Sequence, residues 1–294
     1  MKNTNNSFTN LFVLPFDHRA GFAQKMLGFG EILTLDEKRI VTSYKQIIYE
    51  AIFKAIDMGI AKEHSAVLVD EVYGLDILKD AKEKGLITMQ TIERSGQDFF
   101  DFEYEDWKDH LTNIMPSFAK ALVRYDVSAD NSEQLGRLKK LSDFCIEKKI
   151  GLLIEPLMQN KNYEKEVYDN EYRCLDLNKM ILEMQDFGIE ANIWKIEGLY
   201  KKEQYVEVVK TARNTKERND VGIIILGRNE SKEHVNQWIV AGRDVDGVVG
   251  FAVGRTIFWE PLMKYKNAEI SRGMAVEAIA SDYFEYYKLF KHLE

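Results

Sequence analysis

Eight short apolar runs alternate along this chain with longer amphipathic segments. Runs of this length, rich in aliphatic and β-branched residues, are typical of buried strands. They lie at residues 11–16, 66–69, 86–92, 119–125, 151–154, 193–196, 222–226 and 247–251. Helical periodicity is found at 35–58, 75–84, 131–149, 174–188, 203–217 and 232–242, and again at 267–291. This alternation predicts an α/β protein with a (β/α)8 TIM barrel rather than an open doubly wound sheet, since no GxGxxG follows the first strand.

Length and composition indicate one domain. The chain has 294 residues and no compositional break, so we expect a single barrel over 1–294, with residues 1–8 flexible. The net charge is −8 with basic and acidic residues interspersed, which predicts no nucleic-acid partner. Residues 1–8 lack an apolar signal core and no 18-residue apolar run occurs, so we expect no membrane association and a cytoplasmic location.

Polar residues follow the predicted strands, where a TIM barrel builds its active site. They are Asp17, His18 and Arg19; Asp70 and Glu71; Glu93; Lys120 and Arg124; Glu155; Lys195 and Glu197; Gly227, Arg228 and Asn229; and Gly250, Gly254, Arg255 and Thr256. We interpret Asp70, Glu71 and Glu197 as helix caps or solvated loop residues.

Lys195 is the most informative of these residues. Strand alternation places it on the face opposite Trp194 and Ile196, within an apolar segment. A buried ammonium needs a partner, and a lysine that loses its proton is a nucleophile, so a structural ion pair and a catalytic role both remain open. Lys120 could be a second cation beside Lys195 or a solvent-exposed residue at a strand start.

The glycine-rich segment after the last predicted strand suggests an anion site. Gly250, Gly254 and Arg255 stand where barrels commonly bind phosphate, and Gly227 with Arg228 follows the preceding strand. Backbone N–H groups and the two arginines could converge there on one phosphate. The alternative is that the glycines are turn residues and Arg255 pairs with a carboxylate.

Metal chemistry is not expected. Of five histidines only His18 follows a strand, so a polyhistidine zinc site is not expected, whereas Mg²⁺ held by Asp17, Asp70, Glu93 and Glu155 stays open. Cys145 and Cys174 lie in predicted helices outside any metal-binding spacing, and we expect both to be inert. We predict no metal and no cofactor.

The order of these motifs resembles class I aldolases of the tagatose-bisphosphate aldolase type. More closely, it is similar to the aldolase-like domain associated with 5-dehydro-2-deoxygluconokinase in inositol catabolism. The resemblance covers about residues 11–262. The motifs that carry it are Phe16-Asp-His-Arg19, Val69-Asp-Glu-Val-Tyr-Gly74, Glu93-Arg-Ser-Gly96, Lys120-Ala-Leu-Val-Arg-Tyr-Asp126, Ile154-Glu155-Pro156, Trp194-Lys-Ile-Glu197 and Val253-Gly-Arg-Thr-Ile-Phe-Trp259.

The resemblance implies a Schiff-base lysine at Lys195 and an acid/base glutamate at Glu155. It implies supporting roles for Asp17, Glu93 and Lys120, and phosphate contacts in the loops after strands seven and eight. His18 departs from the pattern, because tagatose-type enzymes have glutamine there. We place His18 and Arg19 among the substrate-binding candidates.

The expected activity is reversible cleavage of a phosphorylated ketose or keto-acid, with dihydroxyacetone phosphate as one product. Substrates of the expected kind are 2-deoxy-5-keto-gluconate 6-phosphate and tagatose 1,6-bisphosphate. A metal-assisted aldolase, a sugar-phosphate isomerase or epimerase, and a non-catalytic phosphosugar-binding module remain alternatives. Four aromatic residues on the last helix either pack on the barrel or form a homo-oligomer contact: Phe284, Tyr286, Tyr287 and Phe290.

Overall fold

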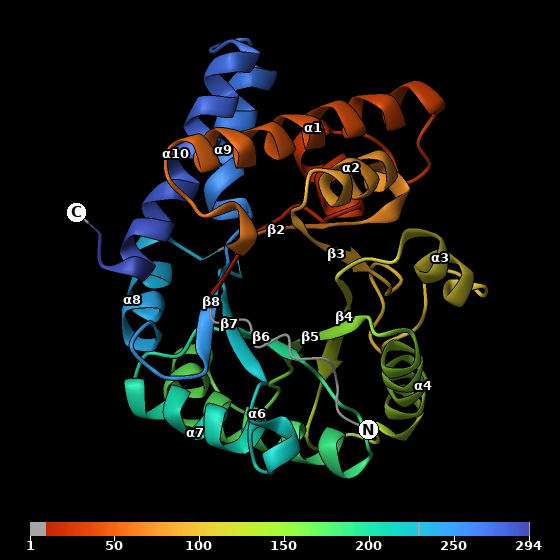
Figure 1. The fold of residues 1–294 in the computed structure, drawn as a ribbon, viewed down its shortest axis with the longest axis vertical. Helices are drawn as coiled ribbons and strands as arrows, with labels where there is room; N and C mark the ends of the chain where they lie inside the picture. Colours follow the sequence, from red (N-terminus) through yellow and green to blue (C-terminus); the bar gives the residue numbers. More distant parts are fainter. Residues whose placement is uncertain (1–9, 229, 294) are drawn as a thin grey trace.

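The computed structural model describes residues 10–228 and 230–293, so the expectation for residues 1–8 lies outside the described residues. Eight parallel strands form a closed barrel in sequence order, surrounded by helices (Figure 1). The strands are β1 (Leu11–Pro15), β2 (Ser65–Val69), β3 (Ile87–Thr91), β4 (Phe118–Tyr125), β5 (Gly151–Met158), β6 (Ile193–Glu197), β7 (Gly222–Leu226) and β8 (Val248–Ala252). The predicted (β/α)8 TIM barrel is confirmed.

In the described chain, seven helices follow the predicted segments, with differences at their ends, and three lie outside those segments. They are α1 (Leu35–Asp57), α2 (Glu71–Glu83), α3 (Trp107–Ile114), α4 (Ser132–Lys148), α5 (Lys165–Val167), α6 (Arg173–Asp186), α7 (Lys202–Ala212), α8 (Lys232–Gly242), α9 (Arg255–Lys266) and α10 (Arg272–Lys291). Helix α2 begins at residue 71 rather than 75, because Asp70 accepts a hydrogen bond from the Tyr73 N–H and caps it.

Three helix predictions are corrected. The segment 94–118 contains α3, although no element was expected there. The predicted helix 203–217 ends at residue 212, where Arg213 turns back and donates from Nε to the Val221 carbonyl at 2.8 Å. The last predicted helix begins at Arg272 instead of 267, and the Ser271 side chain caps it by accepting from the Met274 N–H.

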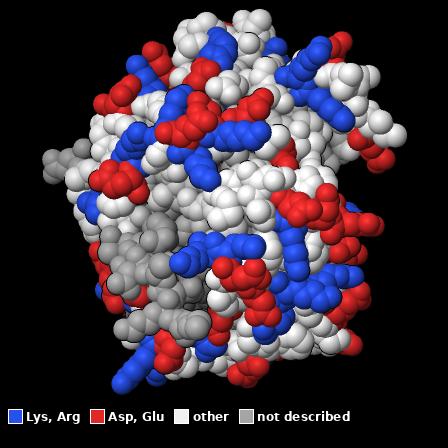
Figure 2. Space-filling view, turned by 45° about the vertical axis from the view of Figure 1, so that its right-hand side comes forward, with Lys and Arg blue, Asp and Glu red and all other residues white. Residues whose placement is uncertain are grey.

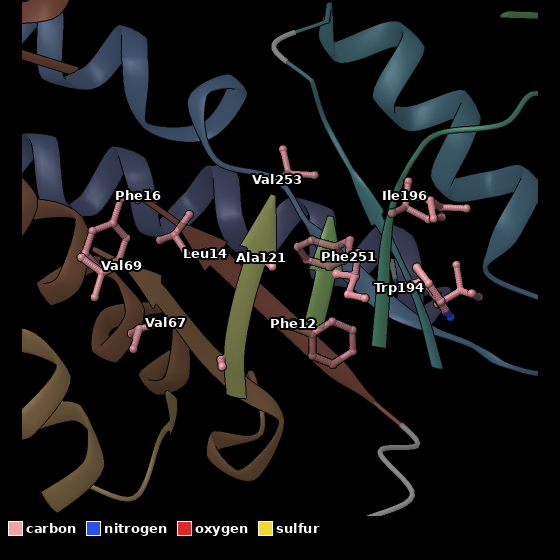
Figure 3. Close-up of a cluster of buried hydrophobic side chains, with 14 of the residues drawn as sticks. Phe12, Leu14, Phe16, Val67, Val69, Ala121, Trp194, Ile196, Phe251 and Val253 are labelled. Carbon is pink, nitrogen blue, oxygen red and sulfur yellow. The ribbon is translucent and has the colours of Figure 1, made fainter. Parts of the chain in front are cut away.

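Alternation along β6 directs Lys195 into the barrel. Trp194 and Ile196 belong to the buried cluster between sheet and helices, part of which Figure 3 shows with Phe12 and Phe251. Ile193 belongs to a second buried cluster, which fills the barrel interior. Lys195 therefore faces the interior, as the sequence predicted.

Gly250 has a structural role in closing the barrel. It lies inside β8, in register with Leu11, the first residue of β1. A Cβ at this position would lie 1.9 Å from the Leu11 carbonyl oxygen. The expectation that Gly250 belongs to a phosphate-binding loop is wrong, because the two strands approach closely there, near the amino-terminal end of β1.

The aromatic face of α10 packs on the barrel. Tyr287 and Phe290 contact the ring of Phe12 in β1, with centroid separations of 5.0 and 5.6 Å. Tyr286 lies 6.1 Å from Phe251 in β8. These three side chains therefore pack on the barrel within one chain.

The molecular surface is mixed in charge on the face drawn in Figure 2, where basic and acidic side chains lie among each other. Within residues 10–228 and 230–293, no helix has both the length and the apolar content that a membrane span needs.

Candidate active site

A cavity of about 200 Å³ opens at the carboxyl end of the barrel. Its walls come from the ends of β1, β3, β4, β5 and β6, where a TIM barrel holds catalytic residues. Among the lining residues are Asp17, His18, Arg19, Glu93, Arg94, Gln97, Lys120, Arg124, Glu155 and Lys195. All five residues predicted to be catalytic thus line one cavity.

Lys120 is the centre of the charged network. Its Nζ lies 2.9 Å from Asp17, 2.7 Å from Glu93 and 2.9 Å from Glu155. Only 1% of the residue is exposed, so its alternative interpretation as a solvent-exposed lysine is wrong. Burial disfavours the ammonium, but the charges of Asp17, Glu155 and Glu93 outweigh this and raise the pKa of Lys120 well above its usual value. Lys120 is therefore a fixed cation.

Lys195 shares one carboxylate with Lys120. Its Nζ lies 2.8 Å from Glu155 Oε2, the same oxygen that contacts Lys120, and the residue is 4% exposed. Burial opposes ionisation of Glu155, yet the charges of Lys120 and Lys195 outweigh it and lower the pKa of Glu155. The ion pair that burial of Lys195 requires is present, and it faces a cavity.

Asp17 and His18 form the β1 side of the site. Burial opposes the charge of Asp17, but Lys120 and Lys195 hold its pKa far below the usual range. For His18, loss of hydration lowers the pKa from 6.5 to about 4, and Arg255 and Lys195 contribute while Asp17 opposes. His18 is thus a neutral hydrogen-bonding group at neutral pH. Its buried Nδ1 has no hydrogen-bond partner within the described part of the chain.

Arg19 organises the loop that follows β3. It forms an ion pair with Glu103 at 2.7 Å and donates to the Glu93 carbonyl at 2.5 Å. Glu93 and Phe102 form an isolated antiparallel bridge in the same loop. Arg19 lines the cavity as predicted, and its observed bonds fix the loop that carries Glu93.

The structure does not bring Arg228 to the cavity. It pairs with Glu197, which is only 2% exposed, and burial raises the pKa of this carboxyl. Arg173 donates to the Gly198 carbonyl at 2.6 Å and pairs with Asp169 in the same region. The interpretation of Glu197 as a solvated residue is wrong, because this glutamate is a buried counterion for arginines.

The loops after β7 and β8 lie side by side. A Cβ on Gly227 would lie 3.3 Å from Val253, and Thr256 Oγ1 donates to the Glu230 carbonyl at 3.4 Å. Gly254 is required because a Cβ there would lie 2.3 Å from the Pro15 carbonyl oxygen. Gly254 therefore permits a close backbone contact, whereas Gly227 lies against the Val253 side chain.

Arg255 differs from Arg228, the other arginine predicted to bind phosphate, in its lack of a carboxylate partner within the described residues. Within residues 10–228 and 230–293, no carboxylate lies within ion-pair distance of it, so the alternative of a carboxylate pair is not found there. Burial lowers the pKa of Arg255, while the charges of Asp17 and Glu155 act in the opposite direction. Arg255 is thus electrostatically coupled to the site.

Lys45 is a buried charge that the sequence interpretation missed. It lies on α1, fully buried, where it pairs with Asp70 and donates to the Phe16 carbonyl at 2.8 Å. Burial lowers the pKa of Lys45. The signal was present, since Lys45 falls on the apolar face that includes Val41 and Ile48.

This pair also bears on the Mg²⁺ alternative. Three of the four proposed carboxylates converge, but they surround the Lys120 ammonium, while Asp70 pairs with Lys45. In the described chain no group of three or more His, Cys, Asp or Glu side chains is arranged to hold a metal. Cys145 and Cys174 are buried thiols, and burial raises the pKa of each to about 12.

The comparison with protein families covers the whole chain. A family model described as "Uncharacterized protein conserved in bacteria (DUF2090)" matches residues 1–294. The chain belongs to this family. A search of the curated proteins finds no match to this DUF2090 member.

Solved structures share the barrel of this DUF2090 member. A fructose-bisphosphate aldolase from Plasmodium falciparum, in complex with TRAP and a small-molecule inhibitor, aligns with a TM-score of 0.69 and 11% identity, over 97% of this chain and 92% of that chain. The protein Cgl0159 from Corynebacterium glutamicum aligns with a TM-score of 0.59 and 16% identity, over 97% and 88%. At these identities the likeness concerns the fold.

Proposed function

We propose that this protein is a class I aldolase that cleaves a phosphorylated ketose or keto-acid through a Schiff base on Lys195. The observation that carries the proposal is the arrangement of Lys195, Glu155 and Lys120 in one cavity. The proposed nucleophile, a carboxylate 2.8 Å from it and a second lysine that stays charged thus lie together in this cavity, which supports the proposal.

A comparison of two buried lysines favours a chemical role for Lys195. Lys45 and Asp70 form a fully buried pair outside the cavity lining, as expected for a structural ion pair. Lys195 and Glu155 both line the cavity and are accessible to a ligand. An ion pair with only a structural role does not require this placement.

The first half of the reaction forms the covalent intermediate. Glu155 takes the proton from Lys195, and the neutral amine attacks the ketone carbon to give a carbinolamine. Glu155 returns the proton to the former carbonyl oxygen, which leaves as water, and the intermediate becomes an iminium ion, which can accept an electron pair. Throughout this step Lys120 stays charged beside Glu155.

The second half breaks and remakes bonds to carbon. A base removes the proton of the hydroxyl group next to the carbon–carbon bond that is cleaved. The electron pair of this bond moves to the iminium, an aldehyde departs, and an enamine remains on Lys195. Formation of the enamine removes one of the two cations beside Glu155, so the pKa of Glu155 rises when this residue has to hold a proton. Protonation of the enamine at carbon and hydrolysis then release the second product and free Lys195.

The supporting residues follow from the same geometry. Arg255, whose guanidinium has no carboxylate partner in the described chain, is the proposed phosphate ligand. His18, neutral at pH 7, is the proposed hydrogen-bonding partner of a substrate hydroxyl. Asp17 and Glu93 hold Lys120 in place.

The proposed substrates come from the sequence resemblance. They are 2-deoxy-5-keto-gluconate 6-phosphate, which would place the enzyme in inositol catabolism, and tagatose 1,6-bisphosphate. Either would give dihydroxyacetone phosphate as one product. The shared barrel with a fructose-bisphosphate aldolase supports the fold-level part of this proposal.

The test is a cleavage assay with mass detection of both fragments, on each substrate, with and without a chelator. We expect both fragments from the wild-type protein, the same rate in chelator, and no turnover by Lys195→Met. Loss of activity in chelator would indicate a metal-assisted reaction. An isomerised but uncleaved ketose would indicate an isomerase or epimerase, and binding without any product would indicate a non-catalytic module.

A further inference from the structure

Arg124 is a guanidinium in the cavity wall without an observed counterion. Residues 118, 120, 122 and 124 of β4 alternate toward the interior, and Lys120, Leu122 and Arg124 line the cavity. Arg124 stands about 13 Å beyond Lys120 along the strand, toward the mouth of the barrel. No carboxylate of residues 10–228 and 230–293 lies within ion-pair distance of it.

The orientation of Arg124 is fixed by one hydrogen bond. Its Nε donates to the Gln97 carbonyl at 3.1 Å. This bond uses the single Nε–H and leaves the N–H groups on both Nη atoms, which form the fork that binds a carboxylate or a phosphoryl group through two hydrogen bonds.

The other arginines of the cavity are neutralised. Arg19 pairs with Glu103 at 2.7 Å, and Arg94 lies 3.7 Å from Asp101. Arg124 is therefore the cavity-lining arginine whose charge is not compensated within the described chain.

The position of Arg124 relative to Arg255 defines two ends of a ligand. Arg255 follows β8 and Arg124 belongs to β4, four strands away in a closed ring of eight, so the two lie on opposite sides of the mouth. Lys195, on β6, stands between these strands in the ring. A ketose held by its phosphate at Arg255 would extend past Lys195 toward Arg124.

We propose that Arg124 binds a second anionic group of the substrate, on the fragment that leaves as the aldehyde. The inference rests on the proposed aldolase function and specifies its substrate class: ketoses with an anion at each end. The distal anion is a carboxylate or a phosphate, and both match the guanidinium fork.

The alternative role for Arg124 is to anchor the loop after β3. Arg137 provides a matched control for that role, because it donates to the Phe100 carbonyl of the same loop at 3.0 Å. Arg137 pairs with Glu133 and Asp101 and lies outside the cavity lining. Arg137→Gln should therefore loosen the loop without affecting an anion in the cavity.

The experiment measures equilibrium binding by calorimetry in the Lys195→Met background, where no turnover interferes. Three probes differ at the end of the ketose that would reach Arg124. This end is neutral in tagatose 1-phosphate, a phosphate in tagatose 1,6-bisphosphate and a carboxylate in 2-deoxy-5-keto-gluconate 6-phosphate. Arg124→Gln, whose amide can still donate to the Gln97 carbonyl, should weaken one or both doubly anionic ligands about 10- to 100-fold and leave tagatose 1-phosphate unchanged. The ligand that is weakened more identifies the distal anion.

Three results would overturn the proposal. The first is that the protein with Arg124 binds all three probes with equal affinity. The second is that Arg124→Gln weakens binding of all three probes equally. The third is that Arg124→Gln and Arg137→Gln change the affinities by the same amount.

A second experiment distinguishes failure of the Arg124 proposal from failure of the aldolase proposal. It is borohydride trapping of dihydroxyacetone phosphate on the Arg124→Gln variant, in which Lys195 is intact. If that protein forms the adduct and the binding experiment shows no selectivity for the distal anion, the aldolase proposal stands and the proposed role of Arg124 is wrong.

Discussion

Glu155 is the residue on which the proposed chemistry depends. One of its oxygens lies 2.8 Å from Lys195 and 2.9 Å from Lys120, so its protonation responds to every change of charge on Lys195. A neutral amide at this position could not accept the proton that the nucleophile must release. We expect Glu155→Gln to reduce kcat about 10²- to 10⁴-fold.

The control for Glu155→Gln is Glu103→Gln, which removes a carboxylate that pairs with Arg19 but does not touch either lysine. Steady-state kinetics on the substrate that the wild-type protein cleaves would compare the two. Unchanged kcat in Glu155→Gln would mean that another group moves the proton.

His18 makes a prediction about stability in acid. Its pKa falls from 6.5 to about 4 on folding, so between these values the unfolded chain binds a proton that the folded protein does not. The free energy of unfolding should therefore decrease as the pH falls through this window, and His18→Gln should remove that part of the decrease. Urea unfolding of both proteins from pH 6.5 to about 4 measures it. Parallel profiles would show that His18 does not contribute.

The location of a site residue was predictable where its position in a strand determines whether its side chain faces the barrel interior. Lys195 and Glu155 face one another because each lies on the inward face of its strand, which alternation reveals. Arg228 was misplaced because its partner, Glu197, comes from the preceding strand, and the sequence does not show which charges pair across strands. Arg124 was visible as a polar strand residue, but its lack of a partner depends on the loop around it.

At the scale of elements, the Lys45–Asp70 pair joins α1 to the start of α2 beside β1. Lys45→Met would leave the Asp70 carboxylate buried without its cation. We expect a loss of about 3–5 kcal/mol in the free energy of unfolding, measured by urea denaturation.

The double variant Lys45→Met with Asp70→Asn tests the cause of that loss. In the wild-type protein the Tyr73 N–H donates to Asp70 Oδ1 at 2.9 Å. An asparagine at position 70 keeps an oxygen that can accept this hydrogen bond but carries no charge. Part of the stability should return. If the double variant is less stable than Lys45→Met alone, the uncompensated charge is not the cause.

Elements with a strong period were predicted best, and the loop after β3 was not. Its aromatic and acidic residues have no helical or strand period, and its fold depends on bonds from distant arginines, including Arg19 and Arg137. The same loop carries Glu93 and Gln97, so part of the cavity wall is set by tertiary contacts that local sequence does not encode.

At the scale of the whole molecule, the barrel explains why residues far apart in sequence meet. Eight strands closing in order bring residue 17 and residue 195 to one mouth, and this topology was predictable from the alternation alone. The substrate was not predictable, because the proposed selectivity depends on Arg124 and Arg255, which only the closed barrel places four strands apart.

The most direct test of the central claim is borohydride reduction in the presence of dihydroxyacetone phosphate, followed by peptide mass spectrometry. Borohydride reduces an iminium to a stable secondary amine, so the adduct marks the lysine that formed it. We expect one adduct, on the peptide that contains Lys195, and none in Lys195→Met. A folded protein that yields no adduct, or one that carries it on Lys120, would contradict the proposed role of Lys195.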